Sequence, residues 1–283
     1  MRSAAFVNPL PFSQGNRASN TLLQARSICT FDETDFAGKQ GDWPYTEADL
    51  NRLDNSNDAF FYDEPRFVTH IDDGAIDSLT GYYEQEFKKL NLEKVDVLDL
   101  CSSWISHLPE TIEYGAVVGL GMNEKELAAN KQLTDFIVQD LNVDPTLSRF
   151  EDNSFDVVCN VVSVDYLQKP NEIFQEIYRI LRPGGVCFMS FSNRCFPTKA
   201  IAMWLQADDI GRLTIVASYF HYSANWESIE AFDLKETQVV PERPSAKDIF
   251  ANPAIGLAWM NSAAAVQKVN QGDPMFVVRG VKP

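Results

Sequence analysis

Residues 155–191 decide the fold: they read FDVVCNVV at 155–162, a helical pattern at 171–181, RPGG at 182–185 and VCFMSF at 186–191. The first run is nearly all apolar, as expected of a strand that is buried on both faces of a sheet. The Pro and the two Gly of RPGG end the helix and turn the chain into the second apolar run. Strand, helix and strand in this order predict a βαβ unit, and hence a parallel sheet.

The same alternation extends along the chain in both directions. Further strands are expected at 95–100, 116–120, 136–138, 212–219 and 275–278, and further helices at 73–90, 123–132 and 198–206. The predicted fold class is α/β, a Rossmann-like, seven-stranded, mostly parallel sheet with helices on both faces and an irregular or weakly helical N-terminal extension. In such sheets a ligand binds beyond the carboxyl ends of the strands, so the candidate site residues follow the strands.

Charge and cysteine content exclude several classes of function. The 283 residues include 24 Lys and Arg against 40 Asp and Glu, a net charge of −16, and the basic residues form no run. Because such a chain repels a phosphate backbone, we expect no nucleic-acid binding. The five Cys form no C-x-x-C pair, which argues against a disulfide framework and a zinc site. We expect no metal site, and a hydrogen-bonded surface or core role for His70.

Residues 1–31 contain three Arg, four Ser and no acidic residue, and Asp32 is the first acid of this strongly acidic chain. Such an N-terminus is typical of mitochondrial and plastid transit peptides. We therefore expect an organellar protein, with the chloroplast slightly favoured over the mitochondrion. A flexible tail is the alternative interpretation.

Residues 249–267 carry no charge, but they include Asn, Ser, Gln, Pro and Gly. This stretch is too polar to span a bilayer, so we expect no transmembrane segment. The favoured interpretation is an amphipathic helix packed on the body of the protein. Docking on a partner or on a membrane surface is the alternative.

Five motifs together resemble a known family: VLDL at 97–100, GLGMNE at 119–124, VQDLN at 138–142, FEDNSFDVV at 150–158 and EIYRILRPGGV at 176–186. In this order they resemble the class I S-adenosylmethionine-dependent methyltransferases, type 11, over about residues 95–222. The stretches DLCSSW, SVDYL and SFSNRCF also resemble a plant and algal branch with a degenerate glycine motif. The resemblance implies three segments: a transit peptide or tail (1–31), an extension with a lid helix (32–92), and a methyltransferase-like domain (93–283) with an insertion at about 225–273.

The resemblance also implies which residues hold S-adenosylmethionine. They are Asp99, Cys101, Ser102, Ser103, Gly119, Gly121, Met122, Asn123, Asp140, Leu141, Asn160, Val162 and Ser163. Two of the three turns that contact the cofactor depart from the family pattern. Cys101, Ser103 and Ile105 stand where the family has glycines, and Gly121 stands where it has the acid that binds the ribose, which puts cofactor binding in doubt. From the residues alone, Asp99 could equally cap a following helix and Asp140 could serve only a turn.

Methyl transfer is a direct displacement, so alignment of the reactants supplies much of the rate without an acid or base. Should the acceptor need a base, the candidates at the pocket mouth are Asp165, Tyr166, His221 and Tyr222. Arg194 either holds an anionic substrate or forms a surface ion pair. The helix at 73–90 and the segment between the last two strands are the expected lid and acceptor-binding elements.

Two functions from different classes follow. The first is an active methyltransferase that acts on a small molecule or a protein. The second is a catalytically inactive methyltransferase-fold protein that serves as a structural or assembly subunit of an organellar complex, with the aromatic-rich residues 43–62 and the uncharged stretch 249–267 as partner surfaces. The acceptor, the organelle and the oligomeric state stay open at this point.

Overall fold

A computed structural model describes residues 25–235 and 240–283. Its strands are β1 (Arg26–Phe31), β2 (Val95–Leu100), β3 (Tyr114–Gly121), β4 (Asp135–Val138), β5 (Phe155–Val161), β6 (Leu181–Phe191), β7 (Ser228–Asp233) and β8 (Phe276–Val281). Its helices are α1 (Glu47–Leu50), α2 (Asp58–Phe61), α3 (Asp73–Lys89), α4 (Glu124–Ala129), α5 (Pro170–Ile180), α6 (Ala202–Gln206), α7 (Asp209–Ser223), α8 (Ala246–Ala251) and α9 (Pro253–Asn270). Two short 3-10 helices, η1 (Glu33–Asp35) and η2 (Val164–Tyr166), complete the elements.

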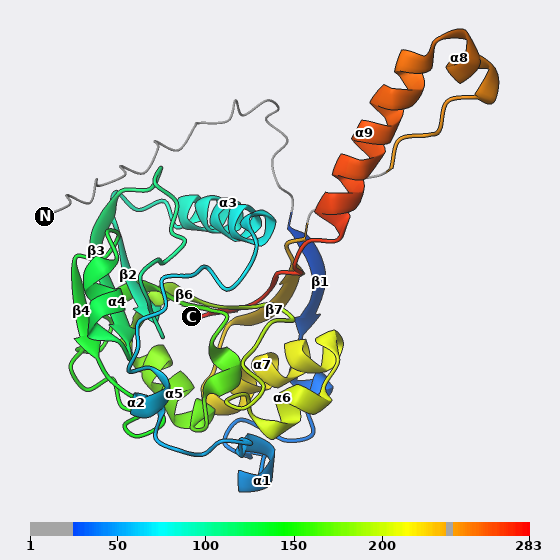
Figure 1. Ribbon diagram of the computed structural model, residues 1–283. Helices are drawn as coiled ribbons and strands as arrows, with labels where there is room; N and C mark the ends of the chain where they lie inside the picture. Colours follow the sequence, from blue (N-terminus) through cyan, green and yellow to red (C-terminus); the bar gives the residue numbers. More distant parts are fainter. Residues whose placement is uncertain (1–24, 236–239) are drawn as a thin grey trace, which may run out of the picture.

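The described strands form one sheet in the order β1-β7-β8-β6-β5-β2-β3-β4 (Figure 1). Strands β2 to β6 run parallel, β8 is antiparallel to β6 and β7, and β1 is antiparallel to β7. From β2 the chain moves outward to β3 and β4, and then returns to β5 on the other side of β2. The strand order therefore reverses between β2 and β5, which is where open α/β sheets bind ligands. The predicted fold class is confirmed.

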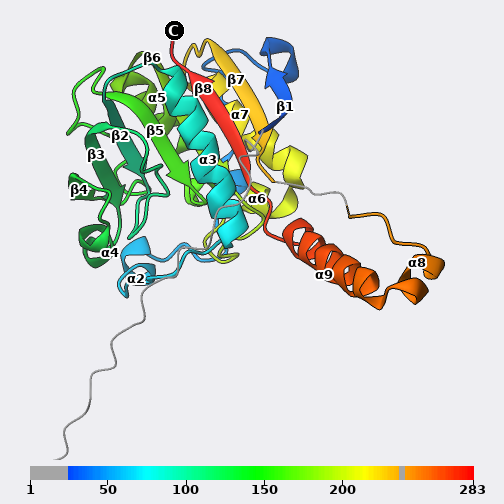
Figure 2. The ribbon, with the colours of Figure 1, turned by 90° about the horizontal axis from the view of Figure 1, so that it is seen from above.

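Helices cover both faces of the sheet (Figure 2). Helices α5 and α7 bury the larger core, in which Phe174 and Phe220 lie against the strands. Helix α3 covers the opposite face, where Tyr83 and Phe87 pack against Phe188 of β6. The connection between β2 and β3, residues 101–113, contains no helix. Helix α3, which precedes β2, thus covers the face where a crossover helix usually lies.

The prediction of a strand at 212–219 is wrong, because this segment lies inside helix α7. Val216, Ala217, Tyr219 and Phe220 are all buried, so the helix has little polar face to reveal its period. The strand missed at this point is β7, which lies within the segment 225–273 expected to be an insertion.

The sheet has eight strands within the described residues, not seven, because β1 pairs with β7 at the edge. The last residues of the expected tail, 26–31, therefore belong to the sheet, and Arg26 pairs with Asp233 at 2.5 Å. The expected transit peptide otherwise falls on residues 1–24, which lie outside the described residues.

The uncharged stretch forms helix α9, as predicted, but this helix does not pack on the body. Helices α8 and α9 project away from the sheet as a hairpin (Figures 1 and 2), hereafter the arm, residues 246–270. Only Gly256 of α9 is buried, against Ile249 of α8, while Leu257 and Met260 are exposed. The helix finds its partner in α8, so the expected contact with the body is not made. In the part of the chain that the structure describes, no helix meets the length and apolarity needed to cross a membrane.

Candidate active site

A cavity of about 520 Å³ opens beyond the carboxyl ends of the parallel strands. Of the thirteen cofactor residues that the resemblance implies, eleven line it: Asp99, Cys101, Ser102, Ser103, Gly121, Met122, Asn123, Asp140, Leu141, Val162 and Ser163. Gly119 of β3 and Asn160 of β5 do not line it. Residues from four separate strand ends thus converge on one space large enough for a small molecule.

Backbone strain is concentrated around this cavity. Among the described residues, six that are not glycine have positive φ, and four of them line the cavity: His70 (62°), Cys101 (58°), His107 (55°) and Val162 (46°). For a β-branched residue such as Val162 this region is a genuine outlier. Strained conformations of this kind persist where the surrounding structure enforces them, and they gather at functional sites. Cys101 thus has the left-handed conformation that glycine adopts most readily.

Asp99 is the second-last residue of β2, where it is buried and accepts a hydrogen bond from Ser102 Oγ at 2.5 Å. Burial raises the pKa of Asp99 to about 6, although the hydrogen bond from Ser102 opposes the shift. No helix follows in residues 101–113, so the alternative that Asp99 caps a helix is wrong. The residue lines the cavity instead.

Gly121, at the end of β3, lies so close to the loop after β2 that no side chain fits there. A Cβ at this position would lie 2.2 Å from the carbonyl oxygen of Ser102. Ser102 N in turn donates to Leu120 O at 2.8 Å, which holds the loop against β3. The family's ribose-binding acid is therefore absent here for a steric reason.

Glu126 of α4 brings a buried carboxylate to the same part of the cavity, five residues beyond Gly121. Its Oε2 accepts from Ser103 Oγ at 2.5 Å, and its Oε1 accepts from Arg66 N at 2.6 Å. Sequence reasoning missed this residue, because an acid in the first turn of a helix is ordinarily explained by the helix dipole.

Asp140 serves the turn that was its alternative interpretation, and it also lies at the cavity. Its Oδ1 accepts from Asn142 N at 2.8 Å, which closes a turn after β4, and the residue also lines the cavity. Asn142 extends this link, because its amide donates to Asp58 Oδ2 at 3.0 Å. The turn therefore connects the strand end to the segment that covers the cavity.

The four candidate bases are not brought together. Tyr166 lines the cavity, and its hydroxyl accepts from Phe196 N at 2.9 Å. Asp165 is buried beside it without lining the cavity, and burial raises its pKa to about 8. His221 and Tyr222 lie on α7 outside the cavity. There His221 stacks on Phe36 at 4.2 Å and its Nε2 contacts Gly38 O at 2.8 Å.

The lid is not the helix expected at 73–90. No residue of α3 and none beyond Pro197 lines the cavity; the cover is residues 58–71, hereafter the lead-in. Arg194 at the rim pairs with Asp273 at 2.7 Å, as its second interpretation predicts.

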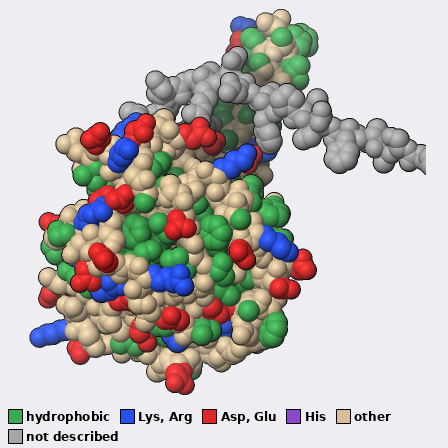
Figure 3. All heavy atoms as spheres, turned by 90° about the vertical axis from the view of Figure 1, so that its left-hand side faces the viewer, with side chains coloured by type: hydrophobic (Ala, Val, Ile, Leu, Met, Phe, Trp, Pro, Cys, Tyr) green, Lys and Arg blue, Asp and Glu red, His purple; other side chains and the backbone are tan. Residues whose placement is uncertain are grey.

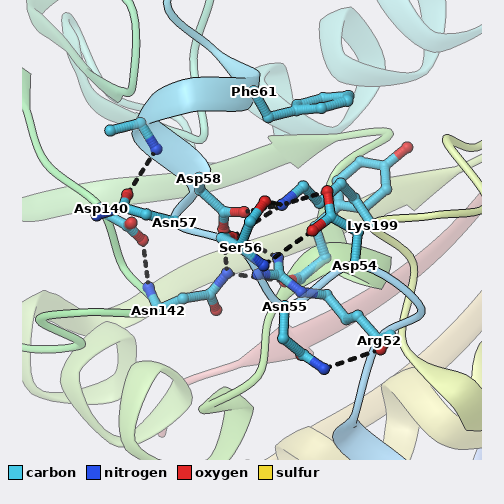
Figure 4. A network of polar contacts seen from close by, with 12 residues as sticks. Arg52, Asp54, Asn55, Ser56, Asn57, Asp58, Phe61, Asp140, Asn142 and Lys199 are labelled. Atoms are coloured by element: carbon cyan, nitrogen blue, oxygen red, sulfur yellow. Dashed lines mark hydrogen bonds and ion pairs between the residues drawn. The ribbon is translucent and has the colours of Figure 1, made fainter.

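The lead-in is fastened by a buried network of ion pairs (Figure 4). Lys199, whose side chain is 1% exposed, lies 3.2 Å from Asp58 Oδ1 and 3.1 Å from Asp54 Oδ2. Arg52 pairs with Asp58 Oδ2 at 2.9 Å, and Asn142 donates to the same oxygen. Burial raises the pKa of Asp58, but the bonds from Arg52 and Asn142 outweigh it, so the net pKa is lowered.

The residues present fit the implied cofactor. S-Adenosylmethionine carries a sulfonium and an ammonium group, and the cavity wall holds the carboxylates of Asp58, Asp99, Glu126 and Asp140. Close approach of backbone at Gly121 and the glycine-like turn at Cys101 leave room along the strand ends. In the part of the chain that the structure describes, no group of three or more His, Cys, Asp or Glu could hold a metal ion.

A family model matches this part of the chain. Residues 98–189 match the type 11 model described as "Methyltransferase domain". The match begins in β2, ends in β6 and includes the strand ends at Asp99, Asp140 and Ser163. The chain therefore contains a class I, S-adenosylmethionine-dependent methyltransferase domain.

A curated relative is the mitochondrial ubiquinone biosynthesis O-methyltransferase of Dictyostelium discoideum, 27% identical over 208 residues. The match covers 66% of this chain and 61% of that protein, so the chain spans about three-fifths of the relative's length.

Two solved methyltransferases are similar to the chain at low identity. One is an S-adenosylmethionine-dependent methyltransferase from Mesorhizobium loti (15% identity, 71% of this chain, 98% of that chain, TM-score 0.40). The other is Haemonchus contortus phosphoethanolamine N-methyltransferase 2 in complex with S-adenosyl-L-methionine (16% identity, 71% of this chain, 52% of that chain, TM-score 0.38).

Proposed function

We propose that this protein transfers a methyl group from S-adenosylmethionine to a small-molecule acceptor. The observation that carries the proposal is the convergence of eleven family-implied positions on one cavity at the switch point of the sheet. The family model over residues 98–189 supports it.

The residues of the chain have distinct tasks in this proposal. The strand ends at Cys101, Gly121 and Asp140 hold the methyl donor, which supplies an electrophilic methyl group when it is bound. Asp140 Oδ1 is engaged by the turn, so its second carboxylate oxygen is the one that would accept a bond from an adenine amine. Glu126 stands in for the missing ribose-binding acid, and the lead-in excludes water above the reacting atoms.

The relative's name supports a hydroxyl as the acceptor group, because that protein is an O-methyltransferase. Its name also supports the mitochondrion for the organellar location predicted from the acid-free N-terminus. Fusing residues 1–24 to a fluorescent protein tests the location: import into mitochondria supports it, and a cytosolic signal contradicts it.

Isothermal titration of S-adenosylmethionine and S-adenosylhomocysteine into the full chain tests the proposal. We expect micromolar affinity for both. Asp140→Asn keeps an oxygen for the turn but removes the second carboxylate oxygen, so it should weaken binding by about 1–3 kcal/mol with little change in the melting temperature. Absence of heat at millimolar ligand contradicts the proposal.

A catalytically inactive assembly subunit is the second candidate, and one observation favours it. The arm presents Phe250, Leu257 and Met260 to solvent, and exposed apolar side chains are common at partner surfaces. Cofactor binding without turnover of any acceptor, together with co-purification of a partner that is lost when the arm is removed, would support this candidate over the enzyme.

A further inference from the structure

The cavity has a second wall that the strand ends do not form. It comes from the lead-in, from η2 and from the loop after β6, which supply the rings of Tyr62, Tyr166 and Phe196. Tyr166 and Phe196 lie 6.2 Å apart at a tilt of 34°, and Tyr166 holds the Phe196 backbone through its hydroxyl. A flat ring binds well to such a wall, because offset and edge-on ring contacts add to the burial of apolar area.

Arg66 is the cation of this wall, and in the described part of the chain no carboxylate lies within ion-pairing distance of its guanidinium. The guanidinium lies over the Phe61 ring at 4.4 Å and donates to Phe61 O at 2.7 Å. The remaining N–H groups of its fork are left for a ligand. An Arg without a carboxylate partner on a cavity wall suits an anionic ligand.

Arg194, the other Arg on the cavity, is different, because Asp273 already neutralises it at 2.7 Å. Arg66 is therefore the better anion site, and Arg194 provides its matched control.

His70 lies beside Arg66 on the same wall and is solvent-accessible. Its ring meets the edge of Phe196 at 5.5 Å, and its backbone is held at φ 62°. Burial lowers the pKa of His70. The charge of Glu126 opposes this shift, and the charge of Arg66 adds to it. A neutral imidazole at pH 7 can accept a proton.

We propose that this wall binds a planar, anionic, hydroxyl-bearing aromatic acceptor, with Arg66 on its negative charge and His70 as the proton acceptor for its hydroxyl. This inference rests on the proposed function. As the acceptor oxygen bonds to the methyl carbon, the carbon–sulfur bond breaks with its electron pair left on sulfur. The hydroxyl proton passes to a ring nitrogen of His70, and solvent later removes it.

The chain has three histidines, so their imidazole signals can be assigned in an NMR spectrum by single replacements. The first experiment titrates 4-hydroxybenzoate and, in parallel, uncharged phenol into the full chain saturated with S-adenosylhomocysteine. We expect 4-hydroxybenzoate to shift the His70 signal and leave His221 unmoved. Phenol should bind at least tenfold more weakly. Equal binding of the two probes, or a shift at His221 alone, overturns the inference.

Substitution separates the two cations. Arg66→Met should weaken binding of 4-hydroxybenzoate about tenfold or more and leave phenol unaffected, while Arg194→Met should change neither by more than about twofold. An effect of Arg194→Met as large as that of Arg66→Met overturns the assignment of the anion site.

The proton role of His70 is tested by acceptors of different acidity. With 4-hydroxybenzoate, whose hydroxyl is protonated at pH 7.5, His70→Gln should slow methyl transfer about a hundredfold. With 4-hydroxy-3-nitrobenzoate, whose hydroxyl is already ionised, the loss should be less than about threefold. Equal losses for both acceptors, or no methylation of either by the unsubstituted chain, overturn the inference.

The same titrations separate this inference from the function on which it rests. If S-adenosylhomocysteine binds and the probes do not, the acceptor assignment fails alone. If the cofactor product itself does not bind, the proposed function fails.

Discussion

At the scale of single residues, the position of Gly121 explains why the end of β3 has no side chain that could bind a ligand. Alanine there would place a Cβ 2.2 Å from the carbonyl oxygen of Ser102, and moving this backbone atom would cost free energy of folding. We expect Gly121→Ala to destabilise the fold by about 1–3 kcal/mol, as overpacking does. Chemical denaturation measures this change.

Gly74 provides the matched control for that substitution. It lies in the first turn of α3, and a Cβ there would have only ordinary contact with Asp72 at 3.4 Å. Gly74→Ala should therefore be neutral or stabilise the fold by about 0.5–1 kcal/mol. Equal losses for the two variants would contradict the steric account of the missing ribose acid.

Asp165 makes a prediction about pH. Its pKa is raised from 3.8 to about 8 by burial, so the folded state keeps a proton that the unfolded state loses. Stability from this group is full at low pH and falls by up to about 1.4 kcal/mol per pH unit as the pH rises through that window. Asp165→Asn removes the titration. We expect urea denaturation at pH 5 and pH 8 to show that the free energy of unfolding of the variant, relative to that of the unsubstituted chain, is higher at pH 8 than at pH 5.

A constant difference in the free energy of unfolding between those two pH values would contradict that account. It would mean that Asp165 ionises in the folded state without cost, and hence that water or a cation reaches its Oδ2.

Residue-scale prediction from sequence succeeded where a strand end carried the signal and failed elsewhere. Asp99 and Asp140 follow apolar runs, so their place beside the cavity could be expected. Arg66 and His70 lie in a segment without periodicity, and only the tertiary fastening of the lead-in brings them to the cavity. Glu126 was not predicted as a site residue, because an acid in the first turn of a helix is already explained by the helix dipole.

At the scale of elements, the runs that were predicted correctly are those with an unambiguous environment. β5 is nearly all apolar because both of its faces are covered, and α3 has a polar face that shows its period. α7 was read as a strand because it is buried nearly all round and contains β-branched residues. Periodicity cannot distinguish a buried helix from a buried strand.

The contribution of β1 to stability can be tested by deletion. Removing residues 1–24 should leave the melting temperature unchanged, whereas removing residues 1–31 deletes β1 and leaves the edge of β7 unpaired. We expect the longer deletion to lower the melting temperature by several degrees, since about 1 kcal/mol corresponds to 2–4 °C at this size. It should also promote aggregation, because open strand edges pair with other chains.

Differential scanning fluorimetry with light scattering measures both deletions. Equal behaviour of the two would show that β1 contributes nothing to the sheet. It would also allow a mature N-terminus at residue 32, as the acid-free stretch suggests.

At the scale of the whole molecule, the arm is separable from the body. β7 and β8 are joined across its base, where Leu234 N donates to Met275 O at 2.8 Å and Lys235 Nζ donates to Gly272 O at 2.6 Å. A short Gly-Ser linker in place of residues 236–271 can therefore close the hairpin. We expect this variant to fold with unchanged affinity for S-adenosylmethionine, as measured by calorimetry. A tenfold loss of affinity would show that the arm acts on the cavity.

The fastening of the lead-in also bears on how fast a ligand leaves the cavity. We expect a bound molecule under residues 58–71 to depart when the contacts of Lys199 and Arg52 with Asp58 are broken, and those side chains are 5% exposed or less. Buried ion pairs are screened little by salt. The residence time of a ligand should thus be long and nearly independent of ionic strength, although the protein as a whole is strongly acidic.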